Sequence, residues 1–172
     1  VGWLCYNDDQ YTSPVAGYWG WLYVMSKAPE QLDTVFLVLR KRPVIFMHWY
    51  HHSVTYFFAQ LYYSDLVPWA RWGIVINLFV HTMYFYFGIR ALGIQVNRRI
   101  PQMITTMQIV QFTSGFYFCY RVFQVVFDES IGCEANTDRM VMGLIVLTTY
   151  LYLFCEFFYR AYIMERSPTK NK

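Results

Sequence analysis

Long apolar stretches, separated by short polar connections, dominate the pattern of this sequence. A helix rises 1.5 Å per residue, so crossing the hydrocarbon core of a bilayer takes about 20 apolar residues. Stretches of this length cover residues 15–39, 43–63, 72–92, 101–126 and 139–164. The pattern predicts an all-α, polytopic membrane bundle with five transmembrane helices, in which residues 1–172 form one domain and 165–172 a short tail.

Prolines refine the expected helices. Pro43 and Pro101 lie at the start of their stretches, where a missing backbone N–H costs nothing because first-turn donors are unpaired. Pro29 lies inside the first stretch, where its ring should displace the carbonyl of Met25. We therefore expect a kink in the first helix.

The composition excludes an ordinary soluble domain. Hydrophobic residues make up 56% of the chain and charged residues 15%, whereas soluble domains carry about 25% charged residues. The mean hydropathy is only +0.23, because sixteen tyrosines and six tryptophans lower it. Such side chains are typical of membrane interfaces, and we expect them there and in the walls of a cavity.

The distribution of charge between the stretches predicts an orientation. Basic residues follow the first stretch, the third stretch and the fifth: Arg40, Lys41 and Arg42; Arg98 and Arg99; Arg166, Lys170 and Lys172. The alternate connections are mainly acidic. The positive-inside rule then places the basic connections and the C-terminus in the cytosol. The net charge of +3 thus reflects topology and does not indicate nucleic-acid binding.

Cys5 and Cys133 fall in the acidic, lumenal connections and could form a disulfide. Closing a loop of this length would stabilise the fold by about 4–5 kcal/mol in the chain-entropy model, less any strain. Non-reducing peptide mapping should recover the linked pair, whereas two free thiols after rapid alkylation would contradict it. Cys119 and Cys155 lie within the stretches without a histidine one helical turn away, so the sequence does not support a cysteine nucleophile.

Three of the four histidines, His48, His51 and His52, lie in one five-residue window, and His81 lies in the next apolar stretch. Positions i, i+3 and i+4 share a helix face. Ordinary core histidines would be scattered, and polar groups within a membrane are costly unless they serve a function. We therefore interpret the four imidazoles as the candidate catalytic cluster.

Polar residues recur about one turn apart in the neighbouring stretches. The sets are Lys27, Glu30, Asp33 and Thr34; Asn77, His81 and Tyr84; and Thr105, Gln108 and Gln111. Lipid offers no hydrogen bonds, so each set must face a partner or a water-filled space. Polar contacts that merely join helices are the alternative. Four such sets, counting the histidines, favour a polar chamber in which Lys27 pairs with Glu30 and Asp33.

Four motifs resemble the fatty acid elongases of the endoplasmic reticulum, the very-long-chain condensing enzymes. They are the segment at 26–42 (SKAPEQLDTVFLVLRKR), the HWYHH box at 48–52, the N-x-x-x-H-x-M-Y-x-Y pattern at 77–86 and the T-x-x-Q-x-x-Q pattern at 105–111. The third motif departs from the family at its end, where Phe87 stands in place of a second tyrosine. The resemblance implies a seven-helix fold around a substrate tunnel, of which this fragment would hold five helices.

The resemblance also implies the chemistry: acyl-CoA and malonyl-CoA give 3-ketoacyl-CoA, CO2 and CoA, without a further cofactor. His51 would carry the acyl group, His81 would act as electrophile or acid/base, and His48 and His52 would orient the site. The implied substrate-binding residues are Lys27, Glu30, Asp33, Asn77, Tyr84, Tyr86, Gln108, Gln111, Arg98 and Arg99, with Lys27, Arg98 and Arg99 meeting the CoA phosphates. Implied partners are the lipid bilayer, the reductases and dehydratase of the elongation cycle, and a second copy in a homodimer.

Two other function classes remain open on the sequence. Membrane di-iron desaturases and hydroxylases also use histidine boxes but need more histidines than the four present, although a single metal on His48, His52 and His81 is geometrically feasible. A transporter or proton pathway could also use polar residues within a membrane. Metal analysis tests the first class, and release of CoA from acyl-CoA tests the second.

The HWYHH box and the SKAPE segment look most like the elongase branch that acts on long saturated and monounsaturated chains. A closed tunnel would set the length limit because the terminal methyl meets a wall. Phe57, Phe58 and Phe116 are candidates for that wall, since they lie on the stretches that carry the histidines and glutamines.

Overall fold

The computed structural model describes residue 6, residues 11–83, residues 93, 95 and 97, and residues 99–127 and 136–164. Within these ranges the regular structure is helical, without strands. The elements are α2 (Pro14–Glu30), α3 (Leu32–Leu39), α4 (Phe46–Ser64), α5 (Ala70–Thr82), α7 (Arg99–Val126), α8 (Thr137–Phe158) and the π-helical turn η2 (Tyr159–Ile163). This confirms the predicted all-helical class.

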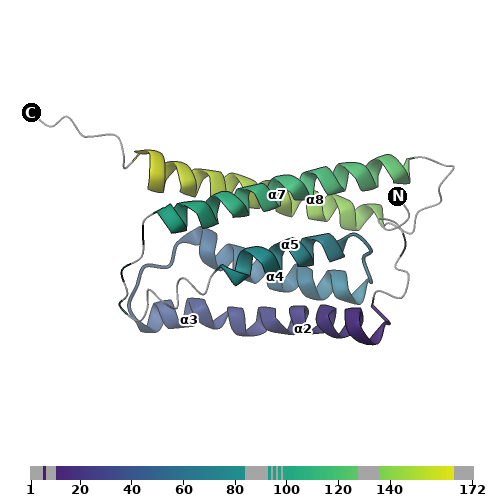
Figure 1. Ribbon diagram of the computed structural model, residues 1–172, viewed down its shortest axis with the longest axis horizontal. Helices are drawn as coiled ribbons and strands as arrows, with labels where there is room; N and C mark the ends of the chain where they lie inside the picture. The colour runs from purple at the N-terminus through teal and green to yellow at the C-terminus, as the bar shows by residue number, and fades with distance from the viewer. Residues whose placement is uncertain are drawn as a thin grey trace, which may run out of the picture.

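The helices lie lengthwise along the molecule in three tiers, with α7 and α8 in one, α4 and α5 in the next and α2 and α3 in the last (Figure 1). Helix α2 packs against α4, α4 against α8, α8 against α7, α7 against α5, and α5 back against α2. The five helices therefore form a closed ring. Segments far apart in the sequence can thereby surround a common interior.

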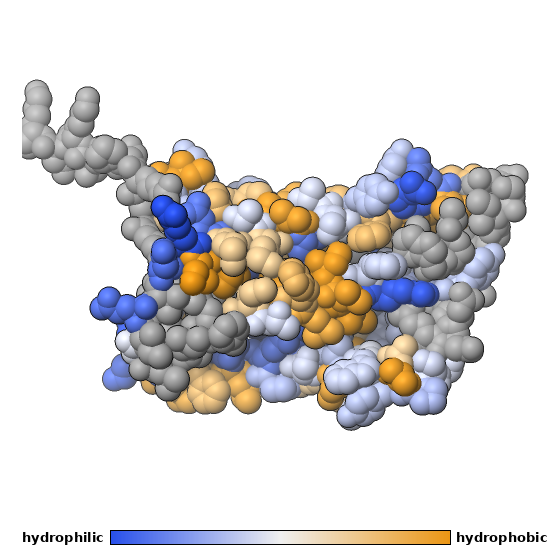
Figure 2. All heavy atoms as spheres, in the orientation of Figure 1, coloured by the Kyte–Doolittle hydropathy of each residue, from blue (hydrophilic) through white to orange (hydrophobic). Residues whose placement is uncertain are grey.

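The outer surface supports a membrane location. Among the described residues, one helical stretch, Thr137–Ile163, is long and apolar enough to cross a bilayer. Large apolar side chains also point outward from other helices, with Phe79 58% and Val110 60% exposed. Figure 2 shows apolar residues in the middle of one face and the most hydrophilic ones toward its two ends. Apolar exposure this extensive is unusual for a soluble monomer.

The first expected helix, over residues 15–39, is interrupted at Gln31 between α2 and α3. Pro29 lies just before the interruption and lacks an N–H for the helical ladder. The side-chain amide of Gln31 donates to the carbonyl of Lys27 (3.3 Å) and to that of His52 on α4 (2.9 Å). The predicted kink is thus a break, and Gln31 ties it to the helix that carries the histidines.

Helix α4 ends in a Schellman motif without a glycine. The N–H of Val67 donates to the carbonyl of Tyr62 (3.0 Å), and the N–H of Leu66 to that of Tyr63 (3.2 Å). Leu66 takes the left-handed conformation, with φ of 52°, that glycine usually supplies at this position. The buried Val67 packs with Tyr62, which is the apolar contact that accompanies this motif.

A clasp formed by Tyr62, Asp65 and Arg139 joins the end of α4 to the start of α8. The Tyr62 hydroxyl donates to the carbonyl of Arg139 (2.8 Å), and the Arg139 guanidinium forms an ion pair with Asp65. Nearby, the Tyr11 hydroxyl donates to the carbonyl of Val67 (2.8 Å), and burial raises the pKa of Tyr11 to about 12. These bonds fix the end of the bundle opposite His48.

Candidate active site

His51 lies at the centre of the helical ring and is almost fully buried. Three aromatic side chains surround its imidazole, with ring-centroid distances of 4.9 Å to Tyr150, 5.6 Å to Phe154 and 6.3 Å to Phe112. They come from α8 and α7, whereas His51 comes from α4. The tertiary fold, more than the local sequence, therefore creates the apolar environment of this imidazole.

Tyr150 holds the backbone of α4 at His51. Its hydroxyl donates to the carbonyl of His51 (3.2 Å) and lies 2.9 Å from Thr55 Oγ1. Both contacts are satisfied if the Thr55 hydroxyl donates to Tyr150. Because Tyr150 binds the main chain of His51, the imidazole itself remains available for chemistry.

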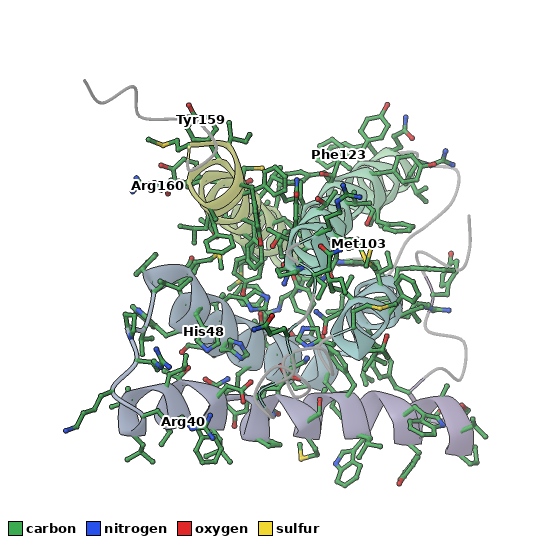
Figure 3. All side chains as sticks on the ribbon, turned by 60° about the vertical axis from the view of Figure 1, so that its left-hand side comes forward. Arg40, His48, Met103, Phe123, Tyr159 and Arg160 are labelled. Carbon is green, nitrogen blue, oxygen red and sulfur yellow. The ribbon has the colours of Figure 1, made fainter. Side chains whose placement is uncertain are left out.

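His48 and His52 lie beside each other, with ring centroids 4.5 Å apart. His48 is on the side of α4 that faces the α2–α3 segment (Figure 3), and Asp33 is close enough to both imidazoles to interact electrostatically. Nε2 of His48 and Nδ1 of His52 are buried and have no hydrogen-bond partner among the residues that the structure describes. Buried polar atoms are rarely left unpaired, so these nitrogens are suited to a water molecule or a substrate group.

Lys27 is the centre of a buried polar network between α2 and α5. Its ammonium forms an ion pair with Glu30 (2.7 Å), donates to Asn77 Oδ1 (3.1 Å) and lies 4.6 Å from the centroid of the Tyr23 ring. The Tyr23 hydroxyl donates to the same Asn77 oxygen (3.3 Å). Asn77 Oδ1 thus accepts two hydrogen bonds, one from Lys27 and one from Tyr23. These two bonds fix the orientation of the side-chain amide of Asn77, including its N–H groups.

His81, on α5, interacts electrostatically with Lys27, Glu30 and His52, and with His51 on the other side of the network. The structure therefore brings all four histidines to one site, together with Lys27, Glu30, Asp33 and Asn77. In the described part of the chain, no three histidine, cysteine or acidic side chains converge in a way that could hold a metal ion.

An apolar cavity of about 220 Å³ begins at this site. Its lining includes His51, Asn77 and Tyr150, and also Tyr62 and Trp69. Along α4 the lining positions are 51, 55, 58, 59, 62 and 63, which share one helix face. From His51 to Tyr62 the helix rises about 16 Å. The cavity is thus elongated, with a polar end and an apolar end.

The glutamines of the fourth stretch also lie at the interior. Gln108 is buried, and Gln111 lines the cavity. Thr105 is buried as well, but its hydroxyl donates to the carbonyl of Pro101 on its own helix (3.0 Å). Arg99 is exposed at the start of α7. Tyr84, Tyr86, Arg98, Cys5 and Cys133 lie outside the described residues.

Two expectations need correction. Lys27 is only 2% exposed and engages Glu30 and Asn77, so it is not a phosphate contact at the mouth of the site. Of the three candidates for the tunnel wall, only Phe58 lines the cavity. Phe57 points outward with 56% of its surface exposed, because the cavity follows one face of α4 and residue 57 lies on the other.

Three further residues of the site, Tyr23, Thr55 and Tyr150, were not predicted from the sequence. Tyr23 lies one turn before Lys27, so its spacing was a usable signal. Tyr150 lies in an apolar stretch rich in tyrosine, and no local pattern distinguishes it from an interfacial aromatic residue. Its role depends on the packing of α8 against α4.

The site and the fold define a class: a helical protein of membrane character with a cluster of imidazoles at one end of an elongated apolar cavity. The sequence matches the model of the ELO (GNS1/SUR4) family over residues 1–170. The chain therefore belongs to this family.

Curated relatives agree with the family assignment. Long chain fatty acid elongase 2 of Caenorhabditis elegans is 52% identical over 169 residues, which cover 97% of this chain and 62% of the relative. Very long chain fatty acid elongase 6 of Mus musculus is 38% identical over 158 residues, which cover 91% and 59%. The chain thus spans about 60% of the length of these relatives. No solved structure matches it.

Proposed function

We propose that the full-length protein is a condensing enzyme of fatty acid elongation, which joins a long-chain acyl-CoA to malonyl-CoA. The observation that carries this proposal is the position of His51. Its imidazole lies where the polar cluster meets the elongated apolar cavity. An acyl chain in the cavity would present its thioester carbonyl to this imidazole, which can act as a nucleophile.

The first half-reaction transfers the acyl group to His51. A ring nitrogen attacks the thioester carbonyl, a C–N bond forms, the C–S bond breaks, and CoA leaves as a thiol after taking up the imidazole proton. In the second half-reaction, malonyl-CoA loses CO2 and becomes an enolate. Its carbon attacks the acyl group, a C–C bond forms and the C–N bond breaks. The released imidazole takes up a proton from solvent, and 3-ketoacyl-CoA leaves.

The other polar groups would stabilise charge during these steps. The amide N–H groups of Asn77, oriented by Lys27 and Tyr23, can donate to a developing oxyanion. The unpartnered nitrogens of His48 and His52 can contact the malonyl group. We assign His81, which interacts electrostatically with His51, as the acid or base of the enolate step.

We place the protein in the endoplasmic reticulum membrane, as a multi-pass protein with a cytosolic C-terminus. Arg40, Lys41 and Arg42 follow α3 and precede α4, at the end of the bundle that carries His48 (Figure 3). With Arg99 at the start of α7, and with Arg98 as a candidate from the sequence alone, they would form a basic cytosolic mouth that suits the phosphates of CoA. The five helical stretches would belong to a seven-helix protein, and the reductases and dehydratase of the cycle, and a second copy, are its proposed partners.

We expect the full-length protein in microsomes to elongate palmitoyl-type saturated primers by one two-carbon unit, in a reaction that depends on malonyl-CoA. The cavity is lined mainly by apolar side chains, and each buried methylene contributes about 0.8 kcal/mol until the chain meets a wall. A panel of acyl-CoAs with radiolabelled malonyl-CoA measures the preference. A preference for a polyunsaturated C20 primer would contradict the expected branch, and no elongation of any primer would contradict the condensing function.

A further inference from the structure

The apolar end of the cavity carries a feature that the catalytic site does not use. Tyr62 lies there, on the same face of α4 as His51 but three turns further along the helix. Its phenol crosses from α4 to α8 and is held by the hydrogen bond to the carbonyl of Arg139. The side chain therefore forms part of the cavity wall between α4 and α8, three helical turns from His51.

Three independent contacts hold Tyr62 in this position. Its main-chain carbonyl accepts the hydrogen bond from Val67 that closes the Schellman motif. Its ring packs against the buried cluster that contains Val67 and Trp69. The ion pair between Asp65 and Arg139 then fixes the Arg139 carbonyl that accepts the phenol proton. A side chain held at its backbone, its ring and its hydroxyl behaves as a rigid wall.

Gly143 leaves room for the phenol on α8. A methyl group added to Gly143 would lie 2.4 Å from the Tyr62 oxygen, which is far below van der Waals contact. Gly143 is one turn after Arg139, the residue that accepts the hydrogen bond, and it lines the cavity. The absence of a side chain at Gly143 is thus what allows the Tyr62 hydroxyl to reach α8.

We propose that Tyr62, seated on Gly143, is the stop that sets the maximum acyl length of this protein. The proposal rests on the condensing function proposed above and adds the residues that limit its substrate. The terminal methyl of the acyl chain meets the Tyr62 ring, so a longer chain cannot place its thioester at His51. Substitutions at the two positions should change product length in opposite directions.

The test measures product length in microsomes that contain the full-length protein, palmitoyl-CoA and longer saturated acyl-CoAs, and radiolabelled malonyl-CoA. Tyr62→Leu and Tyr62→Ala remove the ring, and the longest product should increase by at least one two-carbon unit. Gly143→Ala pushes the phenol away from α8 toward the cavity, and the longest product should decrease by at least one unit. Alanine is favourable in a helix, so the Gly143 variant should not lose its helix.

Matched controls lie on the same helix and on α2. Tyr56→Leu changes a tyrosine of α4 that is exposed and does not line the cavity. Gly20→Ala adds a methyl group at ordinary contact distance, 3.8 Å from the Tyr63 ring. Both should keep the wild-type product lengths. Elongation with unchanged product length in the Tyr62 and Gly143 variants would overturn the stop, whereas a wild-type protein without elongation activity would overturn the condensing function itself.

Discussion

His51→Ala should abolish both the acyl labelling of the protein and the release of CoA from acyl-CoA when malonyl-CoA is absent. The imidazole is the group that would carry the acyl chain, and loss of a catalytic nucleophile lowers the rate by on the order of 10³-fold or more. Radiolabelled palmitoyl-CoA with the full-length protein measures labelling, and a thiol reagent measures the CoA released.

The design of this experiment separates chemistry from folding. Tyr150 donates to the main-chain carbonyl of His51, and that bond survives a change of side chain. Trp49→Leu alters an exposed neighbour on α4 and should retain labelling. Labelling of His51→Ala at the wild-type level would assign the acyl group to another residue.

Lys27→Met should lower the free energy of unfolding by about 3 kcal/mol, because removing one partner of a buried ion pair leaves the other partner without compensation. Glu30 would lose its cation, and Asn77 Oδ1 would lose one of its two donors. Elongation activity should fall as well, since Asn77 would no longer be held toward His51. Thermal unfolding in detergent measures the stability.

A double variant and a surface pair provide the comparison. Lys27→Met with Glu30→Gln removes both charges and should recover part of the lost stability, as expected for a buried pair. Arg160→Met breaks the ion pair with Glu156 at a position that is 72% exposed, and should cost less than about 1 kcal/mol. If Lys27→Met and the double variant lost the same free energy of unfolding, the pairing of the two charges would not contribute to stability.

The helical class and the composition of the polar site were predictable because each depends on a short repeat. A membrane helix needs a long apolar stretch, and residues one turn apart share a face. These rules brought His48, His51 and His52 to one helix and predicted the pairing of Lys27 with Glu30, which the structure confirms. Asn77 and Gln111 also reach the interior, as expected.

What the sequence did not predict depends on contacts between helices. The packing of α4 against α2 and α8 determines which face of α4 lines the cavity. The sequence alone therefore could not show that Phe58 lines the cavity and that Phe57 does not. The turn after α4 contains Leu66 in a left-handed conformation, whereas turn rules expect glycine. The burial of Lys27 follows from the approach of Asn77 on α5, fifty positions away in the sequence.

His51 and Tyr62 both line the cavity on one face of α4, with about 16 Å of helix between them. Substitutions more than about 7–10 Å apart that share no partner usually have additive effects. With the roles proposed above for His51 and Tyr62, a lineage of such proteins could diversify its products through the far end of one helix while the imidazole of His51 stays unchanged. Selection could then change the length of the products through substitutions near Tyr62 without changing the chemistry at His51.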